Sequence, residues 1–236
     1  MRRCKLSPQT QQMLLRCFAA NMSGREAGRF CGVNYKTALL FFRKLRAVIK
    51  AERDLKATGF DGSNAVAIDE CYIKGNWDGG RVAKTVKRGR GTLGKFVVGG
   101  IVSREGGHLK RVKFEELSGI SAVKLLAFAK QHIEPGATVW TDEFRGYNKL
   151  RTVYEHRRCC HAREEWVGKT GATTAGCEVA FRFLRKYLRT YMSGYRYNFK
   201  MFLAECEWRV ETKVANAFPA LLDLCERARA GFFVAA

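Results

Sequence analysis

Three carboxylates occupy places in the sequence where an unpaired charge would be costly. Asp69 lies in the middle of the apolar run AVAIDECYI, Asp142 ends the run PGATVWTD, and Glu178 lies near the start of GCEVAFRFLRKYLRTYM. An ionised carboxylate removed from water is strongly destabilising unless it is paired or binds a cation. Hard divalent cations take oxygen ligands, and two of them about 4 Å apart can activate an attacking oxygen and stabilise a leaving one. The three acids therefore predict a site for metal-assisted phosphoryl transfer.

Each acid also has an interpretation that needs no metal. An Asp inside a strand can be a single satisfied polar residue, and the sequence TDE at a strand end is typical of a helix cap or turn. Glu178 can form a surface ion pair with Arg182, at i+4 on the same helix face. In the functional interpretation, the basic residues of this helix instead contact phosphates near the acids: Arg182, Arg185 and Lys186.

Strand alternation separates Asp69 from its neighbour Glu70. In a strand, successive side chains point to opposite faces, so Asp69 shares a face with Cys71, and Glu70 shares the other with Ile68 and Tyr72. We therefore expect Glu70 to have a structural or supporting role rather than the role of Asp69.

The composition indicates a polyanionic partner. The chain of 236 residues has 43 Lys and Arg against 22 Asp and Glu, a formal net charge of +21, and such a field in a soluble chain most often means nucleic acid. Nine cysteines at irregular spacing, without a CxxC pair, indicate core thiols in a reducing compartment. No apolar run reaches the roughly 18 residues of a membrane span, and the N-terminal segment does not resemble a signal peptide. We expect no membrane association and a cytoplasmic protein.

The elements that must position the acids begin near residue 64. Three β-prone runs, AVAIDECYI, KFVVGGIVS and LKRVKF, are followed by a helical run, SAVKLLAFAKQHI, and a fourth strand, PGATVWTD. A short strand, TVYEHR (residues 152–157), precedes two further helical runs. This order is typical of an RNase H-like α/β domain with a mixed sheet and flanking helices, in which strands distant in sequence bring the three acids together.

The first 50 residues predict helices. Ser7 is a candidate N-cap with Pro8 at the first helical position. A short helix through Phe30, a turn at CGVN and a longer helix from about Tyr35 to Ile49 form the pattern of a helix-turn-helix unit. The residues available to a DNA groove or its phosphates are Asn34, Tyr35, Lys36 and Arg43. A small helical subdomain that only packs on the rest of the chain, or on a partner, is the alternative.

The predicted organisation has four parts. They are an all-α helix-turn-helix domain (1–50), a polar linker (51–63), the RNase H-like catalytic domain (64–213) and a C-terminal helical tail (214–236).

An ordered set of motifs carries a family resemblance. VNYKTALLFFRKLR is followed by AIDECYI, VWTDEFRGY, HRRCCHAREEWV, TTAGCEVAFRFLRKYLR and FLAECEWR. From about residue 5 to residue 213 this set resembles bacterial insertion-sequence transposases with a DDE, RNase H-like catalytic domain, in particular the ISXO-like group. The resemblance implies that the catalytic, metal-binding triad is Asp69, Asp142 and Glu178, with two Mg²⁺ ions that Mn²⁺ could replace. It also implies an accessory role for His161.

Four features depart from the family pattern. The last helix ends with RVE (209–211), where relatives commonly have Arg followed by an aromatic residue and Asn. Ala175 stands where the family usually has Asn, Phe181 stands where relatives commonly have Trp, and Arg185 stands where a Lys usually contacts DNA near the cut. Arginine keeps the charge, whereas loss of the Asn could weaken the site.

The resemblance implies a DNA transposase that recognises terminal inverted repeats through its helix-turn-helix, then cleaves a phosphodiester and transfers the freed strand to target DNA. The basic segment with Lys87, Arg88 and Arg90 is expected to follow a DNA backbone. Two DNA ends must be held together, so we expect a homodimer in the synaptic complex, at the bacterial nucleoid. A structure-specific nuclease of the same fold and a catalytically decayed DNA-binding protein are the alternatives.

Overall fold

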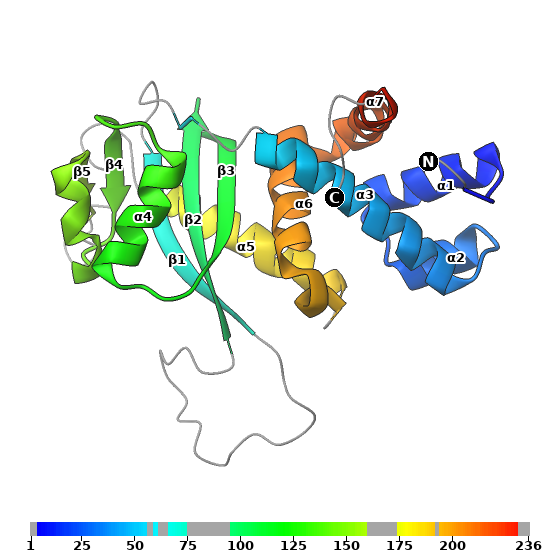
Figure 1. Ribbon diagram of the computed structural model, residues 1–236, viewed down its shortest axis with the longest axis horizontal. Helices are drawn as coiled ribbons and strands as arrows, with labels where there is room; N and C mark the ends of the chain where they lie inside the picture. The colour runs from blue at the N-terminus through cyan, green and yellow to red at the C-terminus, as the bar shows by residue number, and fades with distance from the viewer. Residues whose placement is uncertain are drawn as a thin grey trace, which may run out of the picture. The chain divides into compact units, whose positions relative to one another are not determined.

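The computed structural model describes residues 4–55, 59–60, 66–74, 95–159, 174–191 and 194–230 (Figure 1). The chain divides into two compact units: Met1–Lys56 with Lys186–Ala236, and Ala57–Arg185. The predicted catalytic domain, 64–213, therefore crosses this division at residue 186. None of the described helices is long and apolar enough to cross a membrane.

The unit Ala57–Arg185 is built on a five-stranded mixed sheet. Its strands are β1 (Val66–Lys74), β2 (Lys95–Glu105), β3 (His108–Leu117), β4 (Thr138–Thr141) and β5 (Glu155–Arg158), in the order β3-β2-β1-β4-β5. The first three strands pair antiparallel, whereas β4 is parallel to β1 and β5 is parallel to β4. The mixed α/β, RNase H-like fold class predicted from the element order is confirmed.

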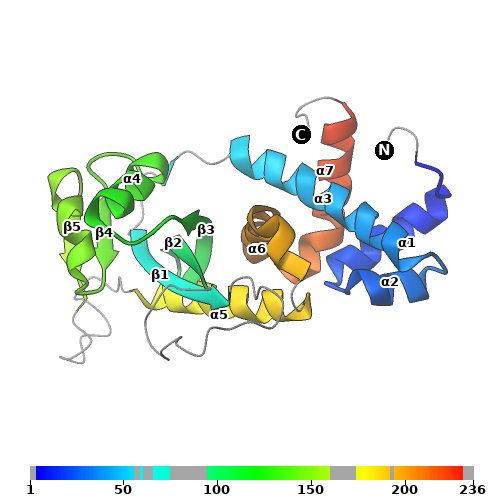
Figure 2. The same ribbon diagram turned by 60° about the horizontal axis from the view of Figure 1, so that its bottom comes forward.

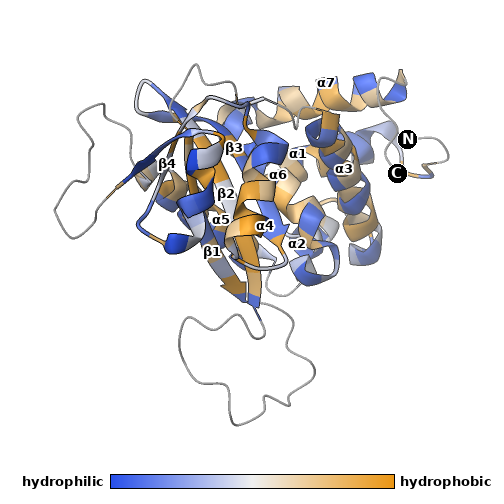
Figure 3. Ribbon diagram, turned by 60° about the vertical axis from the view of Figure 1, so that its left-hand side comes forward, coloured by the Kyte–Doolittle hydropathy of each residue, from blue (hydrophilic) through white to orange (hydrophobic). Residues whose placement is uncertain are grey.

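Helices cover both faces of this sheet, with α4 on one side and α5 on the other (Figure 2). The covering elements are α4 (Ala122–His132), the 3-10 helix η1 (Arg145–Thr152) and the first part of α5 (Ala175–Thr190). One core includes Ile68 of β1, Leu125 of α4 and Val139 of β4. On the other face Phe181 of α5 packs against Phe114 of β3, with ring centroids 5.9 Å apart. The middle of the sheet is correspondingly hydrophobic (Figure 3).

Two adjacent glycines of β2 permit this close packing. A Cβ on Gly99 would lie 2.7 Å from Phe128 of α4, and a Cβ on Gly100 would lie 2.7 Å from Phe181 of α5. Because successive residues of a strand face opposite sides, the pair allows one helix to approach on each face.

The strand predicted at residues 152–157 is displaced along the chain. η1 continues to Thr152, and β5 begins at Glu155 and ends at Arg158. The sequence did not indicate η1, because its residues, RGYNKLRT, are mostly polar, and only Tyr147 and Leu150 are buried.

The N-terminal helices begin at the predicted caps. They are α1 (Pro8–Ala19), α2 (Gly24–Phe30) and α3 (Tyr35–Leu55). The Ser7 hydroxyl accepts a hydrogen bond from the Thr10 N–H at 3.1 Å, and Ser23 and Glu26 form a reciprocal capping box at α2. Capping residues therefore define where the first two helices start.

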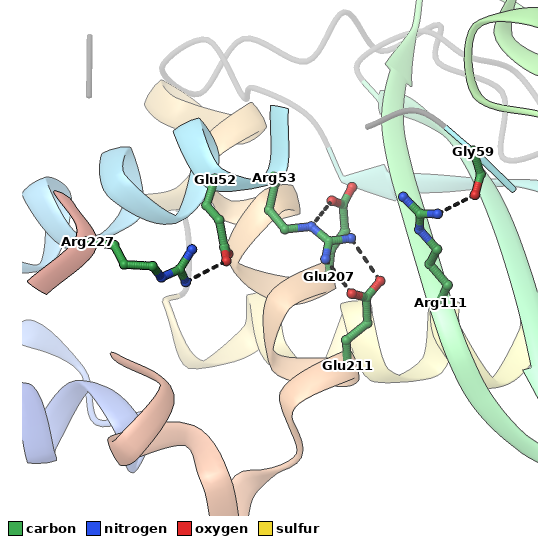
Figure 4. Close-up of polar contacts among 7 residues, drawn as sticks. All are labelled: Glu52, Arg53, Gly59, Arg111, Glu207, Glu211 and Arg227. Carbon is green, nitrogen blue, oxygen red and sulfur yellow. Dashed lines mark hydrogen bonds and ion pairs between the residues drawn. The ribbon is translucent and has the colours of Figure 1, made fainter. Parts of the chain in front are cut away.

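α3 is longer than predicted, because it ends at Leu55 rather than near Ile49. Residues 51–55, expected to belong to the linker, form its last turns. Their polarity did not indicate exposure: Arg53 is buried and donates to Glu207 and Glu211, and Glu52 accepts from Arg227 at 2.9 Å (Figure 4).

The partners of α3 come from the C-terminal helices, α6 (Phe199–Thr212) and α7 (Ala217–Arg229). Trp208 of α6 and Leu221 of α7 join Phe42 of α3 in one buried cluster. On α6 the buried Glu205 accepts hydrogen bonds from Arg46 at 2.5 Å and from Arg209 at 2.7 Å. The motif FLAECEWR thus contributes the buried charges Glu205, Glu207 and Arg209, and its two acids pair with buried arginines of α3.

Candidate active site

Asp69 and Glu70 of β1 face opposite sides of the sheet, as the strand alternation predicted. Glu70 lies two residues after Ile68 on β1, on the α4 side, where Tyr147 of η1 donates a hydrogen bond to its carboxylate. Asp69 of β1 lies opposite Gly100 of β2 in the ladder. A Cβ on Gly100 would point at Phe181 of α5, so this pair of residues faces α5. Asp69 is therefore directed toward the helix that carries Glu178.

Asp142 follows the end of β4. Its Oδ1 accepts a hydrogen bond from the Phe144 N–H at 2.9 Å, and its carbonyl accepts one from the Thr141 hydroxyl at 2.8 Å. The His156 Nε2 of β5 lies 2.8 Å from the same hydroxyl. Burial, followed by the charge of Arg158, lowers the pKa of His156. Because the Thr141 hydroxyl donates its proton to the Asp142 carbonyl, the hydroxyl oxygen accepts from the His156 Nε2–H. These bonds fix the backbone that carries Asp142.

Glu178 lies in the first turn of α5 with its side chain exposed. Its backbone N–H donates to the Thr174 carbonyl at 3.3 Å. A carboxylate in the first turn of a helix is favoured by the partial positive charge of the helix N-terminus. A Glu at this position therefore also stabilises α5, whatever its role in a site.

The structure brings Asp142 and Glu178 within electrostatic reach of Asp69. Burial, together with the smaller effect of the charges of Glu70, Asp142 and Glu178, raises the pKa of Asp69 to about 7. The Glu70 N–H, which donates to Asp69 Oδ1 at 2.8 Å, opposes this rise. Burial and the charge of Asp142 also raise the pKa of Glu70. The result is a partly buried, strongly negative locus in a basic chain.

The chemistry of this locus fits a hard divalent cation. Carboxylate oxygens are the ligands that Mg²⁺ and Mn²⁺ take, and the charges that raise the pKa of Asp69 are other carboxylates. Across the described ranges, however, no three His, Cys, Asp or Glu side chains converge closely enough to hold a metal ion. The acids are near one another without forming a closed ligand cage.

Sequence reasoning missed Tyr147. Its ring is fully buried in the α4-side core, and its hydroxyl reaches Glu70, 77 residues earlier in the chain. Burial, followed by the charge of Glu70, raises the pKa of Tyr147 well above its usual range, so the phenol remains a donor. Its position in VWTDEFRGY, five residues after Asp142, was the available signal.

The predicted basic residues of α5, Arg182, Arg185 and Lys186, are exposed. Burial raises the pKa of the Cys71 thiol to about 12, and the charge of Arg185 opposes that rise. Arg185 therefore lies near Cys71, on the Asp69 side of β1. Phe181, at a position that departs from the family pattern, is buried against Gly100 and Phe114.

The residues predicted to contact a DNA groove are all exposed: Asn34, directly before α3, and Tyr35, Lys36 and Arg43 on α3. The Asn34 side-chain oxygen accepts a hydrogen bond from the Lys36 N–H at 2.9 Å, which caps the start of α3. Leu39 of the same helix is also exposed. The other predicted contacts, Lys87, Arg88, Arg90 and His161, lie outside the described residues.

Comparison with protein families gives a match over residues 61–211, to the ISXO2-like transposase domain. The matched segment covers β1 to α6 and contains Asp69, Asp142 and Glu178. The chain belongs to this transposase family. A search of curated proteins found no match.

Solved structures with similar folds are transposase complexes. A Mos1 strand transfer complex is 10% identical, with a TM-score of 0.28 over 94% of this chain and 81% of that one. A Mos1 mariner paired-end complex with Mn is 9% identical, with a TM-score of 0.28 over the same shares. The Drosophila P element transposase strand transfer complex is 12% identical, with a TM-score of 0.32 over 96% of this chain and 61% of that one. These values are low, and the family assignment rests on the match over residues 61–211 alone.

Proposed function

We propose that this transposase binds the terminal inverted repeats of an insertion sequence and catalyses phosphodiester cleavage and strand transfer with Asp69, Asp142 and Glu178. The observation that carries the proposal is the family match over residues 61–211, which contains all three acids, two of them on or directly after the neighbouring strands β1 and β4. The charges of Asp142, Glu178 and Glu70 also act on Asp69, whose pKa burial raises. Such a concentration of negative charge is costly for folding alone and is explained by cation binding.

Asp69, Asp142 and Glu178 would hold two Mg²⁺ ions, which Mn²⁺ could replace. When bound, such ions activate the attacking oxygen and stabilise the leaving oxygen of an in-line displacement. The chain's own contribution is to place the acids. β1 and β4 are parallel neighbours in the sheet, and α5 presents Glu178 from the face to which Asp69 is directed. The same carboxylates would serve both cleavage and strand transfer.

The exposed basic side of α5 would place the phosphate to be cut. Glu178, Arg182 and Arg185 follow one another at helical spacing, so they share one face of α5. Guanidinium groups bind phosphate oxygens through paired N–H donors. We assign Arg182, Arg185 and Lys186 to phosphate contacts beside the acids.

End recognition is assigned to α2, the turn after it and α3. The exposed residues Tyr35, Lys36 and Arg43 of α3, with Asn34 before it, suit the second helix of a helix-turn-helix unit, whose N-terminal residues contact base edges. On sequence grounds, Lys87, Arg88 and Arg90 would add contacts to the DNA backbone, and His161 an accessory contact near the acids. Because two ends must be held at once, the active species would be a homodimer on DNA.

A cleavage and strand-transfer assay in Mg²⁺ tests the proposal. The substrate is a duplex with both ends of the element and its flanking DNA, compared with a duplex without those ends. Asp69→Ala, Asp142→Ala and Glu178→Ala should each reduce both reactions to background. Glu143→Ala is the matched control, because Glu143 is an exposed acid next to Asp142, and it should act like the wild type.

Three outcomes would contradict parts of the proposal. Wild-type activity in one triad variant removes that residue from the site. Equal cleavage of DNA with and without the ends indicates a structure-specific nuclease. Specific binding of the ends without cleavage indicates a decayed DNA-binding protein, as the Ala175 departure would allow.

A further inference from the structure

A continuous series of contacts joins Asp142 to Asp69, through the side chains of Tyr147 and Glu70 on the α4 side of the sheet. The Phe144 N–H donates to Asp142 Oδ1 at 2.9 Å, and the Phe144 ring packs edge-on against Tyr147, with centroids 6.0 Å apart. The Tyr147 hydroxyl donates to the Glu70 carboxylate. The Glu70 N–H then donates to Asp69 Oδ1 at 2.8 Å.

These contacts are needed to fix the spacing of the acids, because the backbone pairing between β1 and β4 ends before it reaches Asp69 and Asp142. β1 and β4 pair at Val66 with Val139 and at Ala67 with Trp140. Asp69 lies beyond the last of these pairs, and Asp142 follows the end of β4. The spacing of the two carboxylates therefore depends on side-chain contacts past the end of the ladder.

The Tyr147–Glu70 hydrogen bond is well suited to fix that spacing. Tyr147 is 0% exposed, and leaving a buried hydroxyl without an acceptor typically costs about 1–3 kcal/mol. The ring is held in the core that includes Leu125 of α4 and Leu150 of η1. One end of the bond is thus immobile, and the other end is the residue next to Asp69.

We propose that Tyr147 and Glu70 are positioning residues, whose hydrogen bond holds the segment after Asp142 against β1 and sets the distance at which Asp69 and Asp142 receive a divalent cation. This inference rests on the proposed function, because it assigns those two acids to the metal site. Glu70 acts through its acceptor oxygen, and Tyr147 acts through Glu70. Neither residue is required to touch DNA.

A matched tyrosine separates this role from simple core packing. Tyr154 is buried in the same core, and its hydroxyl also has an acceptor, the Ile133 carbonyl at 3.1 Å. Tyr147→Phe and Tyr154→Phe each delete one buried phenolic hydroxyl and keep the ring. Only the first deletion breaks the contacts between the acids.

The experiment measures Mn²⁺ binding to the full chain without DNA, by calorimetry and by the electron paramagnetic resonance of free Mn²⁺. Tyr147→Phe should weaken Mn²⁺ binding about tenfold, which is the lower end of the range for losing a group that orients a metal ligand. Tyr154→Phe should bind Mn²⁺ like the wild type. Glu70→Leu, which removes the acceptor, should match Tyr147→Phe. Glu70→Gln, which keeps an acceptor oxygen but no charge, should remain within about threefold of the wild type. Thermal unfolding of each variant without metal reports the fold.

The outcomes distinguish this inference from the proposed function. If the wild type binds Mn²⁺, Asp69→Ala abolishes binding and Tyr147→Phe binds like Tyr154→Phe, the positioning role is wrong and the metal site stands. If Glu70→Gln loses as much affinity as Glu70→Leu, the charge of Glu70 matters rather than its hydrogen bond, and the positioning role is again wrong. If Asp69→Ala binds Mn²⁺ like the wild type, the metal site and this inference both fail. Should Tyr147→Phe not fold, the two Glu70 variants decide the question.

Discussion

Burial and like charge act together on Asp69. The ordinary pKa of this carboxyl, 3.8, rises to about 7 in the folded chain, so folding favours its protonated form. The stability that this preference contributes is fully present below the unfolded pKa and is lost as the pH rises through about 7. Near and above that pH the folded protein carries a buried negative charge that a divalent cation would compensate.

Replacing Asp69 by Asn should therefore stabilise the metal-free protein at high pH. In EDTA at pH 8 we expect Asp69→Asn to exceed the wild type by on the order of 2 kcal/mol, with the difference vanishing toward pH 4. The Asn side-chain oxygen can still accept the Glu70 N–H. Urea denaturation at several pH values measures the difference. Asp223→Asn, at an exposed acid of α7, serves as the control and should change stability by less than about 0.5 kcal/mol. A pH-independent effect of Asp69→Asn would contradict the assigned cause.

The sequence was sufficient to propose Asp69, Asp142 and Glu178 as candidate site residues, because each stands at a recognisable place: mid-strand, strand end and helix start. It did not indicate Tyr147, since a hydrogen bond between residues 77 apart depends on the tertiary fold. A tyrosine in a polar segment has no periodicity that reveals its burial.

The position of α5 on the sheet depends on Gly100. A Cβ there would lie 2.7 Å from two atoms of the Phe181 ring, and Gly100 stands opposite Asp69 in the β1–β2 ladder. The contact between Gly100 and Phe181, which fixes how closely α5 approaches the sheet, therefore lies beside Asp69. Phe181 is on the same helix as Glu178. Small shifts of this helix alter the relation of Glu178 to Asp69.

Gly100→Ala should consequently lower both stability and activity. Overpacking of this contact is expected to destabilise the protein by about 1–3 kcal/mol and to reduce DNA cleavage even under conditions where the variant is folded. Gly194→Ala is the matched control, because a Cβ at Gly194 meets nothing within 4 Å, and it should alter neither property. Full cleavage activity in a destabilised Gly100→Ala protein would show that activity does not depend on the exact position of α5 on the sheet.

Among the helices and strands, the apolar and capped ones were predictable and the polar ones were not. The starts of α1 and α2 follow from Ser7 and Ser23. The last turns of α3 were mistaken for a linker because Glu52 and Arg53 are charged, although both are buried against partners from α6 and α7 (Figure 4). Local sequence carries no information on such distant pairing.

For the whole molecule, the formal net charge is +21, whereas the candidate site gathers negative charge around Asp69. The positive charge would attract DNA over long distances, and the basic side of α5 would contact phosphates next to the acids. Such contacts increase the affinity for DNA because they release counterions from the phosphates, and this affinity falls steeply as the salt concentration rises.

Removing charges from α5 should therefore change the salt dependence of DNA binding. For the double variant Arg182→Gln/Arg185→Gln, we expect the slope of log K against log[salt] to fall in magnitude by about 2, roughly 0.9 for each lost phosphate contact. The double variant Lys124→Gln/Lys130→Gln removes the same charge from exposed positions of α4 and should leave the slope nearly unchanged. Equal slopes for the two variants would mean that net charge, rather than a contact by α5, governs binding.

The central claim is that Asp69, Asp142 and Glu178 share divalent cations. A crystal of the wild-type chain soaked in Mn²⁺ and measured near the manganese absorption edge tests it directly. We predict anomalous density within about 2.0–2.3 Å of oxygens from all three carboxylates, with two peaks about 4 Å apart when DNA is bound. Three carboxylates separated by more than about 10 Å in the soaked crystal, with no anomalous density between them, would contradict the claim.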